Sequence, residues 1–399
     1  MLSLFKKKPH SALIEKPILA QCFVSIVVPV RDEAENLPKT LASFLNQTDL
    51  ISSPLDPAIF EVIVLVNNCC DNSAEIVEKW QKTNQKFNFH FAEINLPDEN
   101  ANIGFVRRLL MNEACSRLKS NKYRSGIIAT TDGDTRVACD WITNSVNEIR
   151  NGADAIGGRI LIDENEFKSL GKKAENFHLL DEEYRLLAAE IEDFYDRIPH
   201  DSLPRHHQHF NGSFAVTTDA FERAGGIPNV KFLEDVAFYN ALSRIDAKFR
   251  HSSNVKVFTS ARNQGRTELG LSTQLNEWEI MGRNGDLYLV ESAQTIEKRF
   301  TSRRKLRKLW QAVKSETEFD FTEISTLAEN LLISNINLLI ALKKSETFGI
   351  LMEKITDEQN TNNKWKQENS LVPVQKAILD LRKNLKNCAL QTKARNKTA

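Results

Sequence analysis

Short apolar runs alternate with amphipathic stretches along the first third of the chain. The apolar runs are of strand length and rich in β-branched residues, and the stretches between them repeat apolar residues every three or four positions. The predicted strands cover residues 22–30, 60–66, 87–94 and 127–131. The predicted helices cover residues 31–45, 73–80 and 103–118. This alternation predicts an α/β fold with a mostly parallel, Rossmann-like sheet flanked by helices.

The pattern continues beyond residue 135 and then changes. A helix is predicted over 141–149, and strands over 153–160, 213–217 and 255–258. An acidic helical insert over 163–197 has the spacing of an amphipathic cover rather than of a cofactor-binding motif. From about residue 285 glycine almost disappears and helical spacing dominates, which predicts a C-terminal helical appendage.

Polar side chains follow each of three predicted strands in the first third. They are Arg31 and Glu33, Asn67 and Asn68, and Asp132 and Asp134. The carboxyl ends of parallel strands meet at one edge of a sheet, where α/β proteins bind ligands. We therefore expect a nucleotide-type binding crevice, although ordinary loop polarity gives the same pattern.

The acidic turn Asp132-Gly133-Asp134 is the strongest candidate for a metal site. Two carboxylates one residue apart, with a glycine that lets the backbone turn, can direct one oxygen to a divalent cation and another to a sugar hydroxyl. Mg²⁺ or Mn²⁺ would suit these hard oxygen ligands. Asp-Gly is also common turn chemistry, which is the alternative interpretation.

Composition and charge narrow the class of protein. Lys plus Arg and Asp plus Glu are 53 each in 399 residues, so net charge predicts no binding to nucleic acid. No apolar run approaches the roughly 20 residues of a membrane span, and no signal peptide is recognisable. The six cysteines lack paired Cys-x-x-Cys spacing, which leaves zinc and redox motifs unsupported. We expect a cytoplasmic protein.

Five short motifs, in this order and spacing, resemble the family 2 glycosyltransferases with the glycosyltransferase A-type fold. They are 28–33, 66–68 with Asp71, 132–134, 225–226 and 233–238, within a resemblance that covers about residues 24–266. The resemblance implies metal-dependent transfer of a single sugar, with inversion, from a nucleoside diphosphate sugar to an acceptor that the sequence does not identify. A UDP- or GDP-sugar donor and Mn²⁺ or Mg²⁺ are expected.

Residues are also assigned to the donor, several of them by the resemblance. Arg262 and Arg266 are assigned because two arginines around a flexible glycine suit bidentate contact with a diphosphate. Those expected at the nucleotide sugar are Pro29, Val30, Arg31, Glu33, Asn67, Asn68, Arg107, Asp132, Gly133, Arg262 and Arg266. Asp134, with Asp132, is expected at the metal. Many family members carry a metal-binding histidine just after the last strand, but Thr259 stands there and His251 is a poor substitute on spacing.

Glu234 and Asp235 are the second centre of chemistry. They stand at the start of a predicted helix, where the helix dipole favours ionised carboxylates. An inverting transfer needs a base for the acceptor hydroxyl, and the resemblance assigns that role to Asp235. Glu234 would orient Asp235 or hold the acceptor. The alternative is that both residues merely begin a helix.

A histidine-rich loop over residues 199–212 is the expected acceptor region. The residues expected to contact an anionic or polyhydroxyl acceptor are His206, His207, His209, Asn211 and Gly212. A solvated polar loop is the alternative, and a histidine-only zinc site is disfavoured because no ligand spacing recurs.

These expectations give a domain plan. It comprises an N-terminal segment 1–21, a glycosyltransferase domain 22–284 and a helical region 285–399. The domain divides into a nucleotide-binding half, 22–135, and an acceptor half, 136–284. Basic residues cluster over 298–314, which predicts a solvated helix face or a surface that contacts anionic lipid or a partner. Oligomeric state is not indicated, and the rival functions are nucleotidyl transfer and a non-catalytic protein of the same fold.

Overall fold

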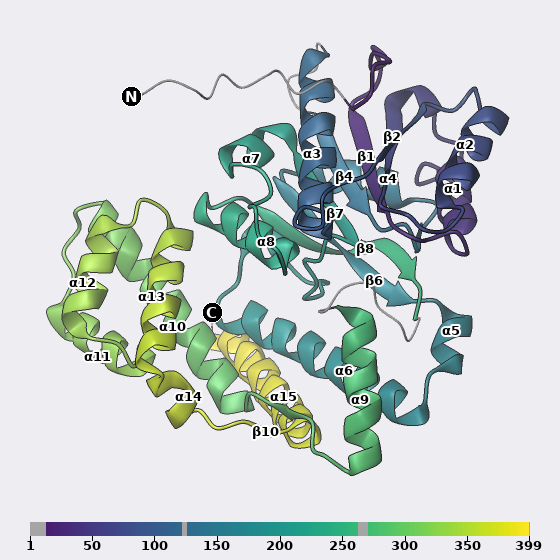
Figure 1. Ribbon diagram of the computed structural model, residues 1–399. Helices are drawn as coiled ribbons and strands as arrows, with labels where there is room; N and C mark the ends of the chain where they lie inside the picture. Colours follow the sequence, from purple (N-terminus) through teal and green to yellow (C-terminus); the bar gives the residue numbers. More distant parts are fainter. Residues whose placement is uncertain (1–12, 122–125, 262–269, 399) are drawn as a thin grey trace. The chain divides into compact units, whose positions relative to one another are not determined.

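The computed structural model describes residues 13–121, 126–261 and 270–398, and the chain forms two compact units (Figure 1). The first unit comprises Met1–Asn147, Phe210–Phe238 and Val255–Phe258. The second comprises Glu148–His209, Tyr239–Asn254 and Thr259–Ala399.

The first unit holds the strands and helices of the predicted nucleotide-binding half together with several elements of the predicted acceptor half, two of which continue into the second unit. They are β1 (Val24–Val30), α1 (Leu37–Leu45), β2 (Phe60–Asn67), α2 (Ser73–Thr83), β3 (Phe89–Ile94), α3 (Ile103–Ser120), β4 (Ile127–Thr131), β5 (Thr135–Val137), α4 (Trp141–Arg150), β7 (Ser213–Thr217), α7 (Thr218–Arg223) and α8 (Glu234–Arg244). The α/β class and the alternation of strands and helices are thus confirmed.

The sheet of this unit has the strand order β3-β2-β1-β4-β7. β1 pairs in parallel with β2 and β4, and β2 pairs in parallel with β3. β7 pairs antiparallel with β4, so that Ser213 lies opposite Thr131 at the end of β4. All residues of β1 and β2 are buried, as expected for central strands covered by helices on both faces. The carboxyl ends of β1, β2 and β4 therefore share one edge, as predicted.

A buried ion pair fixes the amino ends of these strands. Glu61 in β2 is fully buried and accepts hydrogen bonds from Arg117 Nε at 3.0 Å, Arg117 NH2 at 2.7 Å and Ser25 Oγ at 2.8 Å. His90 Nε2 lies 3.3 Å from the same carboxylate. Burial opposes ionisation of Glu61, but the bonds from His90 and Arg117 outweigh it and lower the pKa of the carboxyl from 4.5 to about 2.

This ion pair gives a prediction about acid stability. Because the pKa of Glu61 is lower in the folded state, its contribution is fully present above pH 4.5 and is lost as the pH falls toward 2. We expect Glu61→Gln to lower the free energy of unfolding at pH 7 by roughly 3 kcal/mol and to flatten its pH dependence in that window. Urea titrations between pH 2 and 7 measure this. Glu78→Gln, at an exposed pair with Lys82, is the control and should change stability by less than about 1 kcal/mol. Equal effects of the two substitutions would contradict the prediction.

The second unit is mainly helical. Its elements are β6 (Ala155–Ile162), α5 (Glu164–Ser169), α6 (Lys172–Tyr195), β8 (Phe249–Thr259), α9 (Leu271–Asn284), β9 (Leu289–Val290), α10 (Ala293–Lys314), α11 (Phe321–Leu331), α12 (Asn335–Lys344), α13 (Phe348–Asn362), α14 (Lys364–Glu368), β10 (Val372–Pro373) and α15 (Val374–Thr398). The helical insert and the helical appendage were both predicted, whereas α9 was not.

The compact units differ from the predicted boundary at residue 285. Helix α6, from the predicted insert, packs against α9, α10 and α15. Ile191 of α6 shares a buried cluster with Phe300 of α10 and Leu381 of α15. The insert therefore forms a common core with the C-terminal helices, which sequence spacing alone does not reveal.

The helices of the described ranges were also compared with what a membrane span requires. None is by itself long and apolar enough to cross a bilayer. Helices α11 and α12 meet the requirement for length and composition only as a pair, and the pair is bent by 107°.

Candidate active site

The acidic turn after β4 packs directly on the end of β1. Gly133 lies so close that an added Cβ would be 3.1 Å from Glu33 Cγ and 3.2 Å from the carbonyl oxygen of Pro29. Thr40 Oγ1 of α1 donates to the carbonyl of Gly133 at 2.9 Å. A side chain at position 133 would therefore be tightly packed against the end of β1, and the glycine lets the turn that carries Asp132 and Asp134 lie close to that strand.

Side chains of both loops tie the loop after β1 to the loop after β2. Asp32 has a positive φ of 53°, and its Oδ1 accepts from the backbone N–H of Cys70 at 2.6 Å. Ser73 Oγ accepts from the N–H of Glu33 at 2.9 Å, and Asp71 Oδ2 accepts from that of Ala34 at 2.9 Å. The strand ends that carry the predicted nucleotide-binding residues are therefore held in one fixed arrangement.

Two predicted nucleotide-binding residues follow β1 and two end β2. Arg31 is exposed and donates to the carbonyl of Ala101 at 2.8 Å, whereas Glu33 is buried. Asn67 is buried. Asn68 Nδ2 donates to the carbonyl of Leu96 at 2.8 Å, and Asn68 Oδ1 accepts from the N–H of Leu96 at 3.1 Å. Asn68 is thus held by the chain itself.

The side chains of Pro29 and Val30 are buried in β1. This leaves their backbone as the part that faces the strand end. Arg262 and Arg266, expected over the diphosphate, lie outside the described residues.

Arg107 of α3 connects the two acidic motifs. Its guanidinium is buried, and NH2 donates to Asp132 Oδ1 at 2.6 Å while NH1 donates to Thr130 Oγ1 at 2.7 Å. On its other side, Nε lies 3.4 Å from Glu234 Oε1. The sequence analysis placed Arg107 at the nucleotide sugar, but here it is enclosed by protein groups. Its clearest role is to hold Asp132 and Glu234 in fixed positions.

A close approach of two helices places Arg107 beside Glu234. An added Cβ at Gly104, one turn before Arg107, would lie 2.8 Å from the carbonyl oxygen of Val230 and 3.1 Å from Glu234 Cβ. Asn102 caps α3 by accepting from the N–H of Phe105 at 3.0 Å. The absence of a side chain at position 104 lets the first turn of α3 contact the start of α8. The Gly-x-x-Arg spacing in the sequence carries this signal.

Helix α8 begins at Glu234, as predicted, and Asp235 follows in its first turn. Leu233 precedes it with a positive φ of 55°. Glu234 is buried, and Asp235 Oδ1 accepts from the N–H of Val236 at 2.8 Å. Burial, and then the neighbouring charge of Glu234, raise the pKa of Asp235 above its usual 3.8. A carboxylate with a raised pKa is a stronger proton acceptor.

Asn211 and Gly212 immediately precede β7 and contact Arg107 and the end of β4. The carbonyl of Gly212 accepts from Thr131 Oγ1 at 2.8 Å, and that of Asn211 accepts from Arg107 NH1 at 3.4 Å. The Asn211 side chain is buried, and neither of its amide atoms has a hydrogen-bond partner in the part of the chain that is described. Buried polar groups are normally bonded, so this amide is a candidate for contact with a ligand.

The histidines of the predicted acceptor loop belong to the second unit. His206 is fully buried, where Nε2 donates to the carbonyl of Ser252 at 3.1 Å and Nδ1 accepts from the N–H of Gln208 at 2.9 Å. His209 stacks on Tyr239 with ring centroids 4.2 Å apart.

Burial lowers the pKa values of these histidines, to about 3 for His206, about 2 for His207 and about 4 for His209. These rings are therefore neutral at physiological pH. His206 is fully bonded within the fold, and the contact of His207 and His209 with an acceptor stays a prediction.

The oxygen ligands of the acidic turn fit a divalent cation of the Mg²⁺ type. Such ions commonly bind one or two carboxylates and complete their shell with substrate phosphate and water. Asp132 and Asp134 supply two carboxylates, and among the described residues they do not belong to a compact group of three such ligands. Within the described ranges, Asp32, Cys69 and Asp71 do form a compact group of three potential metal ligands. Both carboxylates of that group already accept hydrogen bonds from backbone N–H groups.

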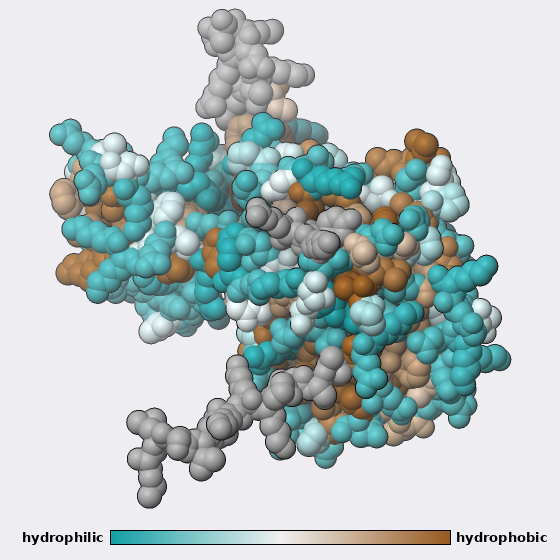
Figure 2. Space-filling view, turned by 90° about the horizontal axis from the view of Figure 1, so that it is seen from above, coloured by the Kyte–Doolittle hydropathy of each residue, from teal (hydrophilic) through white to brown (hydrophobic). Residues whose placement is uncertain are grey.

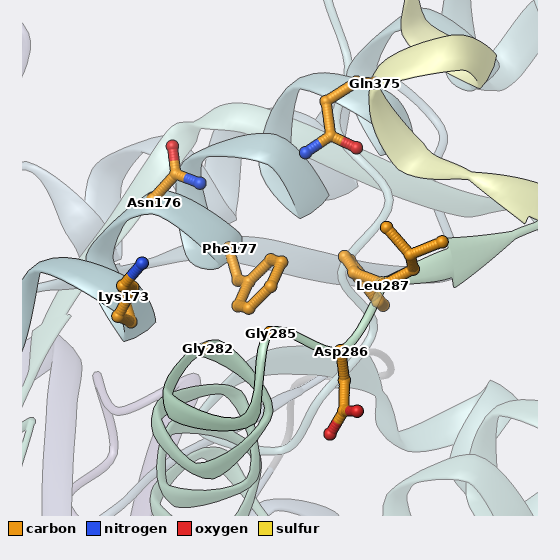
Figure 3. Close-up of a pocket in the computed structure, with 9 residues that line it drawn as sticks. Lys173, Asn176, Phe177, Gly282, Gly285, Asp286, Leu287 and Gln375 are labelled. Carbon is orange, nitrogen blue, oxygen red and sulfur yellow. The ribbon is translucent and has the colours of Figure 1, made fainter.

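A small cavity of about 160 Å³ lies in the second unit (Figure 3). Lys173, Asn176 and Phe177 of α6 line one side, and Leu287 and Gln375 lie opposite. Figure 3 shows the ring of Phe177 near its centre. None of the predicted site residues lines this cavity, and it brings together no pair of carboxylates, so it is not the candidate active site.

Part of the chain is similar in sequence to known glycosyltransferases. Residues 25–218 match the model of Glycosyl transferase family 2. A stretch of 156 residues is 27% identical to the glycosyltransferase AglE of Haloferax volcanii, and it covers 39% of this chain and 44% of that protein. The chain thus spans less than half the length of this relative.

Solved structures were also compared with the whole chain. The mannosyltransferase PcManGT from Pyrobaculum calidifontis, solved with GDP-Man and Mn²⁺, is similar with a TM-score of 0.43 and 13% identity, over 94% of this chain and 90% of that one. Residues 1–349 of TarS from S. aureus, solved with UDP, are similar with a TM-score of 0.40 and 11% identity, over 87% and 92%.

Proposed function

Because residues 25–218 of this chain belong to glycosyl transferase family 2, we propose that the protein transfers a single sugar from a nucleoside diphosphate sugar to an acceptor hydroxyl, with inversion at the anomeric carbon. The observation that carries the proposal is the position of Arg107. It contacts Asp132 of the acidic turn and Glu234 of the carboxylate pair, so that the donor side and the base side of the reaction lie next to each other.

Asp235 is the proposed base. It removes the proton of the acceptor hydroxyl as the oxygen attacks the anomeric carbon, and the bond from that carbon to the diphosphate oxygen breaks. The products are the glycosylated acceptor, the nucleoside diphosphate and a protonated Asp235. The raised pKa of Asp235 suits this step, and the bond from the N–H of Val236 leaves its second oxygen for the proton. Glu234, held by Arg107, orients the first turn of α8.

Asp134 and Asp132 are proposed to hold Mn²⁺ or Mg²⁺ together with the donor diphosphate. Such an ion, when bound, neutralises charge on the diphosphate leaving group. Arg107 already occupies Asp132 Oδ1, so Asp132 Oδ2 and the carboxylate of Asp134 are the oxygens proposed for this role.

Base and ribose are proposed to lie along the ends of β1 and β2, near Arg31, Glu33 and Asn67. Because Asn68 is held by the Leu96 backbone, the site is proposed to read the base through fixed loop geometry, and both UDP- and GDP-sugars remain candidates. The unpartnered amide of Asn211 is proposed to bond a hydroxyl of the transferred sugar or of the acceptor.

A binding screen tests the donor half of the proposal. We expect one of UDP, GDP, CDP and dTDP to raise the melting temperature with Mn²⁺ and to have little effect without it, because ligand at 100 times its Kd adds about 2.7 kcal/mol of stability. Asp134→Ala should remove the metal-dependent shift. Asp219→Ala, at an exposed acid of the same unit, is the control and should retain it. Stabilisation by none of the four diphosphates would favour a non-catalytic protein, and a shift that survives Asp134→Ala would remove Asp134 from the metal site.

A further inference from the structure

Helix α10 carries basic residues of two kinds. Arg299, Arg303 and Arg307 pair with acidic residues of the second unit, and Arg307 NH2 lies 3.2 Å from Asp196 Oδ2. Arg304, Lys305, Lys308 and Lys314 are instead exposed and have no acidic partner within the described ranges. The opposite face of the helix, with Leu306 and Leu309, is buried in the core of α10–α13. The paired arginines are held by ion pairs, whereas the charge of the exposed cations is not neutralised by an acidic residue of the described ranges, although Arg304 and Lys314 each donate to a backbone carbonyl.

Helix α12 exposes a stripe that is apolar at one end and basic at the other. Ile336 is 72% exposed and Ile340 is 45% exposed, and Lys343 and Lys344 follow at the spacing of the same helix face. The apolar residues that α12 needs for packing, such as Leu338 and Leu342, are buried on its other side. On the lobe at the left of Figure 2, which contains α11–α13, apolar residues reach the surface between hydrophilic ones.

The two surfaces are continuous. Lys314 at the end of α10 donates from Nζ to the carbonyl of Lys343 in α12 at 3.4 Å. We call the joined surface the basic-apolar band, and it consists of Arg304, Lys308, Lys314, Lys343, Lys344, Ile336 and Ile340. Residues 298–314 and 335–344 contain no acidic residue, and the exposed Glu316, Glu318 and Glu346 lie just beyond them, so the band itself is positively charged although the chain as a whole is neutral.

We propose that the basic-apolar band docks the protein on an anionic phospholipid surface. Such a surface supplies negative headgroups for the lysines and an apolar layer for the isoleucines, so both halves of the band gain a partner. A nucleic acid would meet only the cations and would leave Ile336 and Ile340 in water. The inner faces of α11 and α12 are used in their own core, through Leu327 and Leu338 for example, so the contact is a surface contact rather than a span.

Co-sedimentation with vesicles tests the proposal on the full chain. Vesicles of phosphatidylglycerol and phosphatidylcholine are compared with phosphatidylcholine alone at low salt. Each exposed lysine near an anionic surface raises the partition coefficient onto the vesicles about fivefold. The double substitution Lys343→Gln with Lys344→Gln should therefore lower this coefficient roughly 30-fold. Ile336→Asn should lower it at least about tenfold, because the buried apolar area is lost. Lys364→Gln with Lys366→Gln, at exposed lysines of α14, is the matched control and should stay within about threefold of wild type.

The outcomes are distinct because none of the three variants changes a residue of the first unit. Unchanged melting temperatures and an unchanged nucleotide-induced shift in every variant separate lost docking from lost folding. Salt-sensitive binding to the anionic vesicles alone, weakened by the α12 variants and not by the α14 control, is the expected result. Absence of binding to the anionic vesicles, equal binding to neutral ones, or equal loss in the α14 control would overturn the proposal.

Discussion

Asp235→Asn is expected to lower kcat by about 10²–10⁴-fold, the usual contribution of a positioned general base. Asparagine has nearly the shape of aspartate and can still accept from the N–H of Val236 through Oδ1, so the start of α8 should be preserved. What it loses is the oxygen that takes the proton. Donor affinity, measured by calorimetry with the nucleoside diphosphate, should therefore change by no more than about threefold.

The control for this substitution is Asp219→Asn at an exposed acid of α7, which should leave kcat unchanged. Because Asp235 must be ionised to act, and its pKa is raised, activity should decline on the acid side at a pH above the usual 3.8 of aspartate. Undiminished turnover in Asp235→Asn, with an intact acid limb in its pH profile, would remove Asp235 as the base.

Arg107→Met is expected to damage both stability and turnover. It removes the cation between Asp132 and Glu234 and leaves Glu234 buried without an opposite charge, which typically costs about 3–5 kcal/mol. Asp132 would also lose its 2.6 Å bond and with it a fixed orientation at the donor. We expect a lower melting temperature and a kcat/KM reduced by at least about 10²-fold. Chemical denaturation and donor turnover measure the two effects.

The adjacent Arg108 provides the matched control. It is only half-buried, on another face of α3, and has no acidic partner in the described ranges, so Arg108→Met should change stability by less than about 1 kcal/mol. Arg107→Lys keeps the charge but loses the planar fork that reaches three acceptors at once, and it should fall between wild type and Arg107→Met. Equal stability and turnover of Arg107→Met and Arg108→Met would show that Arg107 does not hold the two motifs.

Sequence patterns predicted the sheet well because its physics is local. The apolar runs of β1, β2 and β4 are buried on both faces, and parallel pairing then forces the polar residues after them to one edge. Asp132 and Asp134 could be placed there with no knowledge of the rest of the chain. The start of α8 at Glu234 was predicted in the same way, since charged residues before an apolar helical run mark a helix start.

The partners of Arg107 could not be predicted in this way. Helical periodicity places residue 107 among the buried positions of α3, but it does not show that the cation is met by Thr130 and by Glu234, far away in the sequence. Similarly, Asn68 has the chemistry to read a base, but its amide is bonded to Leu96 in the folded chain. Helix α9 was not predicted although Leu271, Leu275 and Trp278 have helical spacing, because the loss of glycine that indicated helical structure begins only at Gly285, where α9 ends.

The most direct test of the central claim follows the reaction itself. The protein is incubated with Mn²⁺, each candidate nucleotide sugar with an α-linked donor bond and a panel of hydroxyl acceptors in which water is included. The first sugar product is observed by proton NMR as the nucleoside diphosphate is released. The account predicts release from one donor, with the sugar appearing first in the β configuration, and its loss in Asp235→Asn. Release with an α-configured first product would contradict inversion by a base at Asp235, and no release from any donor would contradict sugar transfer.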